Sequence, residues 1–486
     1  MKTIKISLLS TALLCMMFSC SRDDCEYGIS GPDLKAGATE SLVIRVAPSG
    51  GDDTGNLVNA FAEAISLGEG TEVRLLEGNF SVGLVEIHEF YGRFTGAGKG
   101  KTVITARKDL DIAPVLSQNL NPYLIKFVGG DIYMSNMTIK TPDGILTLHP
   151  VMTWLEGLVA FSARNRVYVS MHDHIRAAID NVEFISGSDW PSGYRSNCNT
   201  GLLAGLDSQG SKLAGGWPLS PTDVSITNCY FENFDIYGAL IAYINKGTVT
   251  VTGGNYFNHN STQAYGYGGS LAFWHNNDLN VTIAGNTFYD GPGARFGIEV
   301  MSSPWPAYLQ QVDQTRATVF DIEKNEFLIA GGTGGILVND QRRVIYSDAI
   351  PMIFNVKSNK FLLSDEGFTG IGCFSMSGMV IRNNSFSGEG SYGIRVMRTA
   401  PVLNENGLML GNNLSNATFS VTSVLLNTGS RNWTIVGGNL GETLTDYGAN
   451  NIITGFNVNY SDVPFGETIV DNLEEMRDGL KSLREK

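Results

Sequence analysis

The stretch NVTIAGNTF at residues 280–288 decides the fold, because variants of it recur along the chain. Its pattern is an apolar residue, any residue, an apolar residue, two polar or glycine residues, and then Asn, any residue and Phe. Further copies read DVSITNCYF (223–231), VFDIEKNEF (319–327), MIFNVKSNKF (352–361) and MVIRNNSF (379–386). A second phrase follows most copies, namely GALIAY (238–243), GSLAFW (269–274), GIEVM (297–301), GILVN (335–339), GIGCF (370–374) and GIRVM (393–397). The chain is therefore built from a repeated unit of two or three short strands.

Within the first phrase apolar and polar residues alternate, which is the period of a strand with one buried face. Val281 and Ile283 face one way, and Thr282 and Ala284 face the other. Asn tolerates left-handed backbone angles, so we expect the Asn of each copy to bend the strand. The expected bends are at Asn255, Asn286, Asn325, Asn359, Asn384, Asn413 and Asn439, with Asn136 and Asn181 one position earlier in less regular coils.

The repeat predicts an all-β chain folded as a single-stranded, right-handed parallel β-helix. No helical pattern separates the strands, and the spacing between copies varies while the phrase stays constant, which is typical of fixed rungs with variable loops. Coils would stack about 4.8 Å apart, with Phe on Phe and Asn on Asn. Stacking should place Ile283, Ile322, Val356 and Ile381 in one column. A β-propeller is the alternative, but it needs four strands per blade and a more regular period.

The two ends of the chain differ from the repeat. Residues 1–19 combine two lysines with a short apolar run, as secretory signals do, and residues 20–40 predict a flexible tether. The β-helix is predicted over 41–465, opening with a capping helix over 56–67 that has Leu57, Phe61 and Ile65 on one face. Residues 466–486 predict an amphipathic helix that either caps the open end of the solenoid or pairs with another chain.

The stretch MFSC at 17–20 resembles the lipobox of bacterial lipoproteins, with Cys20 as the lipidated residue. The polar SRDD that follows, at 21–24, resembles the export tag of surface lipoproteins. The resemblance implies a protein held at the outer membrane or cell surface by a lipid. An ordinary cleaved signal with an incidental Cys is the alternative.

Charge and metal-ligand patterns narrow the possible partners. The formal net charge of −14 argues against nucleic acid, whose phosphates need a basic surface. The segment His172, Asp173, His174 could supply two metal ligands, but no third ligand is assigned, so no metal site and no cofactor is predicted. Calcium is conceivable, although no motif supports it. Cys229 and Cys373 fall at inward positions of the repeat, and the cysteines do not form an even, spaced disulfide framework. We expect the protein to be a monomer.

A family resemblance adds to this pattern. GGDDT at 50–54, the amphipathic helix, RLLEGNF at 74–80 and FTGAGKGKTVI at 94–104 resemble, in that order, the N-terminal segment of pectin-lyase-like proteins. With the Asn-centred repeats, the resemblance covers most of residues 42–460 and implies a right-handed β-helix. It implies no particular activity, because this fold hosts lyases, hydrolases, adhesins and binding proteins.

In polysaccharide-cleaving relatives of that kind, the cleft lies along the sheet of strands such as GIEVM. The resemblance places Glu299 and Arg395 on the outward side, and Glu299 with Asp340 is the best carboxylate pair for glycoside hydrolysis. Lyase chemistry needs a base and a cation beside a uronate carboxyl; His275 is the base candidate, and the cation candidates are Arg395, Arg398, Arg342 and Arg343. The alternative for each is a solvated charge or an ion pair.

Loop insertions are the other place where function is expected. They carry aromatic residues, of which Trp190, Tyr194, Tyr267 and Trp305 are predicted to contact substrate together with Arg342, Arg343 and Arg398. Flat sugar faces stack on such rings, although the rings could instead cover the coils. The sequence lacks the NTD, DD, HG and RxK set of polygalacturonases and the DH and RxPxxR segments of pectate lyases. A polysaccharide lyase or glycoside hydrolase is therefore predicted beside an alternative, a non-catalytic glycan-binding or adhesive protein.

Overall fold

The computed structural model describes most of the chain between residues 42 and 462. The described residues are 42–112, 115, 121–144, 155–162, 175–188, 197–205, 222–260, 268–291, 293–302, 316–342, 350, 352–364, 368–397, 403–441, 443–454 and 459–462. The predicted signal, tether and C-terminal helix lie outside them. Among the described residues, no helix has the length and apolarity needed to cross a membrane.

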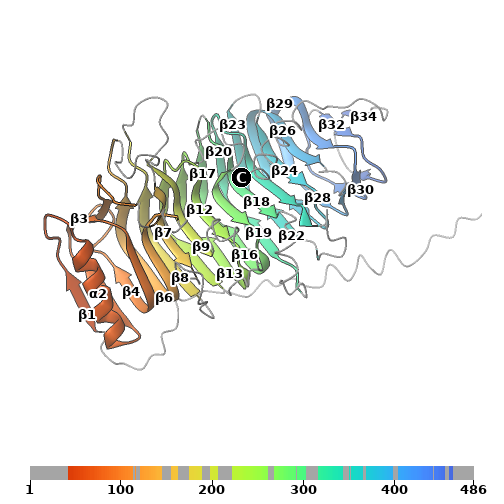
Figure 1. Ribbon diagram of the computed structural model, residues 1–486. Coiled ribbons are helices and arrows are strands. Elements are labelled where there is room, and N and C mark those ends of the chain that lie inside the picture. The colour runs from red at the N-terminus through yellow and green to blue at the C-terminus, as the bar shows by residue number, and fades with distance from the viewer. Residues whose placement is uncertain are drawn as a thin grey trace, which may run out of the picture. The chain divides into compact units, whose positions relative to one another are not determined.

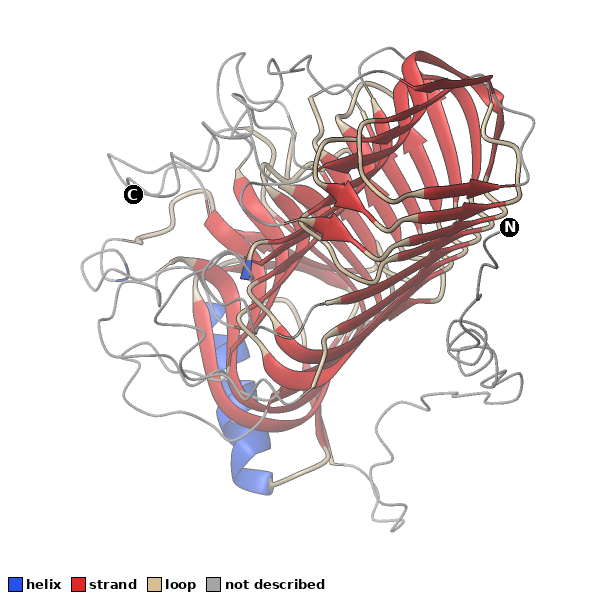
Figure 2. Cartoon of the chain, turned by 90° about the vertical axis from the view of Figure 1, so that its right-hand side faces the viewer, coloured by secondary structure: helices blue, strands red, loops and turns tan. Residues whose placement is uncertain are grey.

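The described strands form one continuous ladder of 32 strands, all paired in parallel, and a separate pair, β27 (Asn404–Glu405) with β30 (Ser430–Arg431). The ladder winds through three sides, here named A, B and C, and β4 (Val85–Thr95), β6 (Tyr123–Lys140), β8 (Ile175–Ile185), β26 (Ser385–Met397) and β29 (Asn413–Leu426) each run through a bend from one side to another. Figures 1 and 2 show strands of successive coils lying side by side. The predicted parallel β-helix is confirmed.

Side A contains the strands of the first phrase. They are β1 (Val43–Val46), β2 (Thr71–Leu75), β10 (Thr222–Thr227), β13 (Asn245–Thr252), β16 (Asn277–Ala284), β19 (Val319–Glu323), β22 (Ile353–Lys357), β25 (Val380–Arg382), β28 (Leu408–Leu410), β31 (Thr434–Val436) and β33 (Ile452–Thr454), with parts of β4, β6 and β8. Ile283 is in register with Ile322, Ile322 with Val356, and Val356 with Ile381. All four side chains are buried, so the predicted column is confirmed.

Side B follows the bend and stacks the Phe residues. Its strands are β3 (Gly78–Val82), β5 (Thr102–Ala106), β11 (Tyr230–Glu232), β14 (Tyr256–Asn258), β17 (Thr287–Asp290), β20 (Glu326–Ile329) and β23 (Lys360–Ser364), with parts of β6, β8, β26 and β29. Seven rings from Phe184 to Phe386 lie in one stack, with centroids 4.6 to 4.9 Å apart and planes within 9° of parallel. Offset or parallel stacking of this kind adds to the burial of each ring.

The bends correct one expectation about Asn. The left-handed residue of most bends is the one before the repeated Asn, such as Gly285, Lys324 or Ser358, whereas Asn136 and Asn181 are themselves left-handed. The repeated Asn residues instead form a buried amide ladder from Asn255 through Asn286, Asn325, Asn359 and Asn384 to Asn412. The ladder uses Asn412, so Asn413 and Asn439, both exposed, are not its members.

The ladder Asn residues from Asn255 to Asn384 each pair both the donor and the acceptor side of their amide. In Asn325 the Nδ2 group donates to the Ile283 carbonyl at 2.9 Å and to Asn359 Oδ1 at 3.0 Å. Its Oδ1 accepts from the backbone N–H and the Nδ2 of Asn286, both at 3.0 Å. A buried amide is stable only when its donors and acceptor are paired. Hydrogen bonding, rather than backbone angle, therefore explains why Asn recurs.

Side C contains the strands of the second phrase. They are β7 (Leu155–Ser162), β9 (Cys198–Gly205), β12 (Tyr237–Ala242), β15 (Gly269–Trp274), β18 (Phe296–Ser302), β21 (Gly334–Asp340), β24 (Thr369–Phe374), β32 (Thr443–Asp446) and β34 (Asn459–Asp462), with parts of β4, β6, β26 and β29. The phrase opens with Gly because a Cβ at Gly335 or Gly370 would lie 2.6 or 2.4 Å from the ring of Phe361 or Phe386. The Phe stack of side B thus limits the residue at the start of side C.

A single helix within the described residues, α2 (Thr54–Leu67), packs on the first coils, as Figure 1 shows. Phe61 contacts Phe90, Phe94 and Phe127 with ring centroids 5.0 to 5.7 Å apart. The expected capping helix is present, but Ile65 is 41% exposed and Ala64 takes the buried position instead. Cys229 and Cys373 are buried free cysteines, and Cys198 is buried at the start of β9.

Candidate functional site

Side C is the side at which the chain is most often interrupted by segments outside the described residues. Residues 163–174, 206–221 and 303–315 directly follow β7, β9 and β18, and residues 343–349 begin two residues after β21 ends at Asp340. Residues 145–154, 189–196 and 261–267 precede β7, β9 and β15. Insertions therefore attach at both ends of the side C strands, which makes the outer face of side C the candidate functional surface.

Glu299 lies on this outer face, at the centre of β18. Its neighbours Ile298 and Val300 belong to the interior core, so alternation directs Glu299 away from that core. Glu299 is nevertheless only 1% exposed. Its Oε2 accepts a hydrogen bond from Trp274 Nε1 at 3.1 Å, and its Oε1 accepts one from the Gly268 N–H at 3.5 Å.

The surroundings of Glu299 alter its protonation. Burial raises the pKa of its carboxyl to about 7, and the hydrogen bonds from Trp274 and Gly268 and the charge of Arg295 oppose this rise only in part. A carboxyl with a pKa near 7 is partly protonated at neutral pH, so it can either donate or accept a proton. The geometry therefore makes Glu299 the strongest acid–base candidate on this face.

His275 directly follows β15 in a left-handed conformation with φ 53°. Its ring lies 5.0 Å from Tyr243 and 5.9 Å from Trp274, measured between centroids. Burial lowers the pKa of His275 to about 4, so the ring is neutral at pH 7. Such a ring is a weak base, and its packing suits an aromatic lining better than the proton abstraction expected of it.

Arg395 shares a register column with Glu299. The column runs from Glu299 through Leu337 and Gly372 to Arg395, which places the two charged residues three coils, or about 14 Å, apart. The guanidinium carbon lies 4.7 Å from the ring centroid of Tyr392. Burial lowers the pKa of Arg395, and its Nε has no hydrogen-bond partner in the part of the chain that the structure describes. This cation thus has an unused donor.

The structure does not bring Asp340 to Glu299. In the register Glu299 is opposite Leu337, and Asp340, three residues further along, is opposite Ser302. Alternation then gives Asp340 the opposite face, and the two carboxyls do not form the expected pair across a groove. The other residues set beside Glu299 on its own face are Ala272 and Leu337, neither of which carries a carboxyl.

Asp340 and Arg342 instead form a buried bidentate ion pair. Arg342 Nε donates to Asp340 Oδ1 at 2.8 Å and Nη2 donates to Oδ2 at 2.9 Å, with the side chains 1% and 3% exposed. Arg342 Nη2 also donates to the Ile350 carbonyl, and Asp340 accepts from the Met352 N–H. The pair fastens the two ends of the 343–349 segment, which explains its burial and corrects the expected substrate-binding role of Arg342.

The remaining predicted residues are Cys20, Trp190, Tyr194, Tyr267, Trp305, Arg343 and Arg398, and all of them lie outside the described residues. The His172–His174 segment lies there as well. Among the described residues, no cluster of three His, Cys, Asp or Glu side chains could hold a metal ion.

Sequence reasoning overlooked several residues of this face. Trp274 binds Glu299, Tyr392 supports Arg395, and Asn339 Oδ1 and Gln341 Nε2 are buried without partners. The alternation within GSLAFW puts Trp274 on the same side as Ala272, and that signal was present in the sequence. The unpaired atoms of Asn339 and Gln341 had no such signal, because pairing depends on three-dimensional packing.

Comparison with known proteins bears on the fold. No family model matches the sequence, and no curated protein matches it significantly. Among solved structures, the catalytic unit of a GH87 α-1,3-glucanase from Streptomyces thermodiastaticus strain HF3-3 aligns with a TM-score of 0.50 at 12% identity, covering 88% of this chain and 70% of that one.

Two further structures align with lower scores. A polygalacturonase from Erwinia carotovora ssp. carotovora aligns at 11% identity with a TM-score of 0.42, over 87% of this chain and 96% of that one. PfbA, a surface adhesin of Streptococcus pneumoniae, aligns at 14% identity with a TM-score of 0.44, over 79% and 91%. At these identities the likeness concerns the fold alone. Together with the continuous parallel ladder, the likeness to the α-1,3-glucanase shows that the chain has the right-handed parallel β-helix fold of pectin-lyase-like proteins.

Proposed function

We propose that the protein binds a polysaccharide along the outer face of side C. The observation that carries this proposal is a set of buried polar atoms on one face that have no partner among the described residues, namely Arg395 Nε, Asn339 Oδ1 and Gln341 Nε2. Groups that serve only packing are normally paired, so unpaired donors and acceptors favour an outside ligand with many hydroxyls.

The aromatic residues of the same face support a sugar as that ligand. Trp274, Tyr243 and Tyr392 lie beside Glu299, His275 and Arg395, respectively. Sugar rings combine flat apolar faces with hydroxyl edges, and sites that bind them combine aromatic rings with a few placed polar groups. The α-1,3-glucanase with a similar fold makes a polysaccharide the first ligand class to test.

A second candidate function is cleavage of the bound glycan, as a polysaccharide lyase or a glycoside hydrolase. The raised pKa of Glu299 favours it, because a general acid or base works best when its pKa lies near the operating pH. Hydrolysis through Glu299 and Asp340 has no support in the register. A catalytic function would therefore depend on Glu299, the carboxyl of this face whose pKa lies near neutrality.

A panel of purified polysaccharides tests both functions. Binding is measured by affinity electrophoresis, and cleavage by new reducing ends and by absorbance of unsaturated products. We expect binding to at least one glycan, lost in a Trp274→Ala variant that keeps its melting temperature. Binding without product would leave a glycan-binding protein. Absence of binding to every glycan of the panel, with product also absent, would contradict the proposal.

We also propose that Cys20 carries a lipid that holds the protein at the outer membrane, facing the cell surface. The lipobox-like MFSC and the following SRDD support this. Metabolic labelling with a palmitate analogue should label the wild type, and a Cys20→Ala variant should be unlabelled and released from membranes. Equal labelling of both proteins would contradict the anchor. Sedimentation of the soluble chain from residue 41 should give a monomer.

A further inference from the structure

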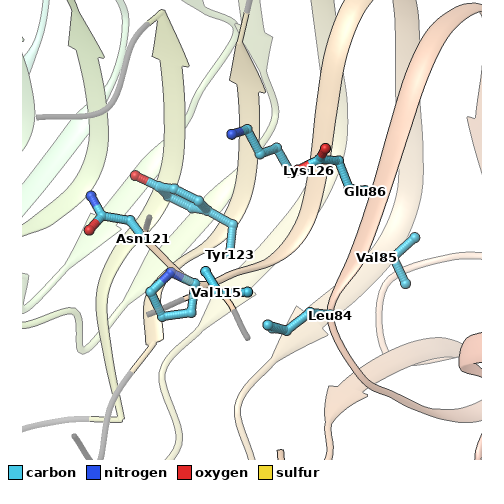
Figure 3. A pocket seen from close by; sticks show the side chains of 8 residues that line it. Leu84, Val85, Glu86, Val115, Asn121, Tyr123 and Lys126 are labelled. Atoms are coloured by element: carbon cyan, nitrogen blue, oxygen red, sulfur yellow. The ribbon is translucent and has the colours of Figure 1, made fainter. Parts of the chain in front are cut away.

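A small hollow lies between β4 and β6 in the first coils of the solenoid (Figure 3). It has room for about one water molecule, and Lys126, which lines it, lies in register beside Glu86. The hollow therefore lacks both the space and the free charge of a ligand site. What the first coils offer to a partner is instead their outer surface.

Exposed apolar side chains are concentrated at this end of the solenoid. Within the described residues, eleven large apolar side chains are exposed, and six of them belong to residues 42–91. These six are Leu42, Val58, Ile65, Leu67, Leu76 and Tyr91. Single exposed apolar residues need no explanation, but a group of them is typical of a surface that contacts another molecule.

Four of the six belong to segments that backbone hydrogen bonds hold together. They are Leu42, Ile65, Leu67 and Tyr91, here named the cap patch. The Glu72 N–H donates to the Leu42 carbonyl at 2.8 Å, and the Gly70 N–H donates to the Tyr91 carbonyl at 2.7 Å. Gly70 follows Leu67 by three residues, at the end of α2. The four side chains are 41% to 53% exposed, so the patch presents apolar surface where α2 ends beside the first strands of side A.

The chain leads from this patch directly to the proposed lipid. Leu42 is the first described residue, and residues 21–41 separate it from Cys20. A flexible tether of that length has a root-mean-square span of about 25 Å and cannot exceed about 75 Å. Because the tether enters the fold at the cap patch itself, the patch is held close to any membrane that carries the Cys20 lipid.

We propose that the cap patch rests on the lipid surface that anchors Cys20, and that this contact sets the N-terminal end of the solenoid against the membrane. The exposed Glu63, Glu69 and Glu89 lie close to the patch in sequence, so burial of apolar side chains, rather than charge attraction, supplies the contact. Tethering raises the effective concentration of the patch at the membrane, so a weak contact suffices. The proposal takes its setting from the anchor proposed at Cys20, but the affinity of the patch for lipid does not depend on that anchor.

This orientation keeps the candidate site away from the lipid. Figure 1 shows α2 and β1 at one end of the ladder of coils. From β4 to β18 the side C ladder passes through β6, β7, β9, β12 and β15. These six steps of about 4.8 Å amount to about 29 Å, so a long polysaccharide can approach Glu299 without meeting the membrane.

A fluorophore on the cap patch tests the contact. The chain from residue 21 onward, with Cys25→Ser, carries an N-terminal hexahistidine tag and is held on phosphatidylcholine vesicles that contain a nickel-chelating lipid. An environment-sensitive dye is attached to Leu67→Cys, since Cys198, Cys229 and Cys373 are buried. We expect its emission to rise at least threefold on the vesicles and to be quenched by a spin-labelled lipid. The same dye on Ile452→Cys, a position that is 57% exposed in β33, is the control and should not change.

The outcomes separate this proposal from the anchor. Equal emission changes at Leu67→Cys and Ile452→Cys overturn the lipid contact. A rise that follows protein concentration without vesicles assigns the patch to a second copy of the chain and overturns it as well. A rise on vesicles, together with equal metabolic labelling of the wild type and Cys20→Ala, keeps the lipid contact and removes the anchor.

Two variants show whether the apolar side chains of the patch supply the contact. With the dye on Tyr91→Cys, the double variant Leu42→Ser, Ile65→Ser should reduce the vesicle-induced rise at least threefold. Its melting temperature should stay unchanged, because both side chains are exposed. Leu362→Ser, at a position that is 47% exposed on side B, is the matched control and should keep the full rise. Equal losses in the two variants would contradict a contact made by the cap patch.

Discussion

The inner and outer faces of the same strands follow different rules. On the inner face, each coil repeats its neighbour: Ile283 lies on Ile322, Phe288 lies on Phe327 with parallel rings, and Asn286 bonds to Asn325. On the outer face of side C, successive positions of one column are Ala272, Glu299, Leu337, Gly372 and Arg395. Residue types therefore repeat from coil to coil on the inner face but not on the outer face.

This difference separates what the fold requires from what it permits. The Asn ladder of the inner face is paired from coil to coil, whereas on the outer face Arg395, Asn339 and Gln341 have buried atoms without a partner among the described residues. A solenoid is stable when neighbouring coils match, and the outer positions contribute little to that match. Changes on the inner face should therefore alter stability, and changes on the outer face should alter binding.

The largest effect on stability is expected at Asp340, which was predicted to be catalytic but lies on the face opposite to Glu299. Asp340→Asn leaves the Arg342 guanidinium as an uncompensated buried charge, which should reduce the free energy of unfolding by about 3–5 kcal/mol. Denaturant midpoints measure this loss. The half-exposed pair Lys357–Glu323 provides the control, and Glu323→Gln should cost under about 1 kcal/mol. If Asp340→Asn abolished glycan turnover but kept the wild-type midpoint, its structural role would be refuted.

The next effect concerns the amide ladder. Asn325→Ala removes the side-chain donor to the Ile283 carbonyl and the acceptor of the Asn286 N–H, while Asn359 Oδ1 keeps the bond from the backbone N–H of residue 325, and we expect a loss of about 2–4 kcal/mol. Urea denaturation followed by circular dichroism measures it. Asn413→Ala is the matched control, because the exposed Asn413 bonds only locally to Ser415 and should change stability by less than about 0.5 kcal/mol. Equal losses would show that the ladder is not special.

Glu299 should couple stability to pH. Its pKa in the folded protein is about 7, above that of an unfolded Glu, so the folded state holds the proton more tightly. The associated stability is complete below about pH 4.5 and is lost as pH rises to 7, amounting to about 3 kcal/mol. Glu299→Gln stays neutral, so it should exceed the wild type in stability at pH 8 and equal it at pH 4. Denaturation at several pH values tests this, and parallel curves would contradict the raised pKa.

Arg395 should affect binding more than folding. Arg395→Ala removes a buried cation with an unused donor, so affinity for a glycan bound on side C should fall about tenfold, or about 1.4 kcal/mol. The unfolding midpoint should stay the same or rise, because the desolvated charge is gone. Titration calorimetry measures affinity. A lower midpoint with unchanged affinity would assign Arg395 to the inner, structural class.

The smallest effect is expected on the outer face of side B. Lys360 bonds to Glu326 at 2.8 Å, but the two side chains are 70% and 48% exposed. Lys360→Ala should change the free energy of unfolding by less than about 0.5 kcal/mol, since water screens such pairs. A thermal melt suffices. A clearly larger loss would mean that outer positions also support the coils.

The sequence predicted the inner face well because its signals are local and repeated. Alternation around Ile283 and the recurrence of Phe288 place both residues without any three-dimensional information. Asn was recognised for the wrong reason: its tolerance of left-handed angles suggested a bend, and the confusion of Asn412 with Asn413 followed. Each bend contains two adjacent positions, one with positive φ, such as Asn383, and one with a buried amide, such as Asn384. Both positions favour Asn.

The outer face was predicted only in part. Alternation put Glu299 and Arg395 on the outward side, but burial, Trp274 and the raised pKa depend on coils that are distant in sequence. The predicted pairing of Glu299 with Asp340 failed because β18 and β21 are in a register that sets Glu299 beside Leu337. Asp340 is three residues further along, so its side chain lies on the opposite face of the strand.

The register column that joins Glu299 to Arg395 has a consequence for how such a chain changes during evolution. Every coil contributes one position to the column, so adding or removing a whole coil moves two charges apart or together by one step of about 4.8 Å. Neighbouring coils would still match, because their inner columns are alike. The distance between two binding positions along a polymer can thus change only in whole coil steps.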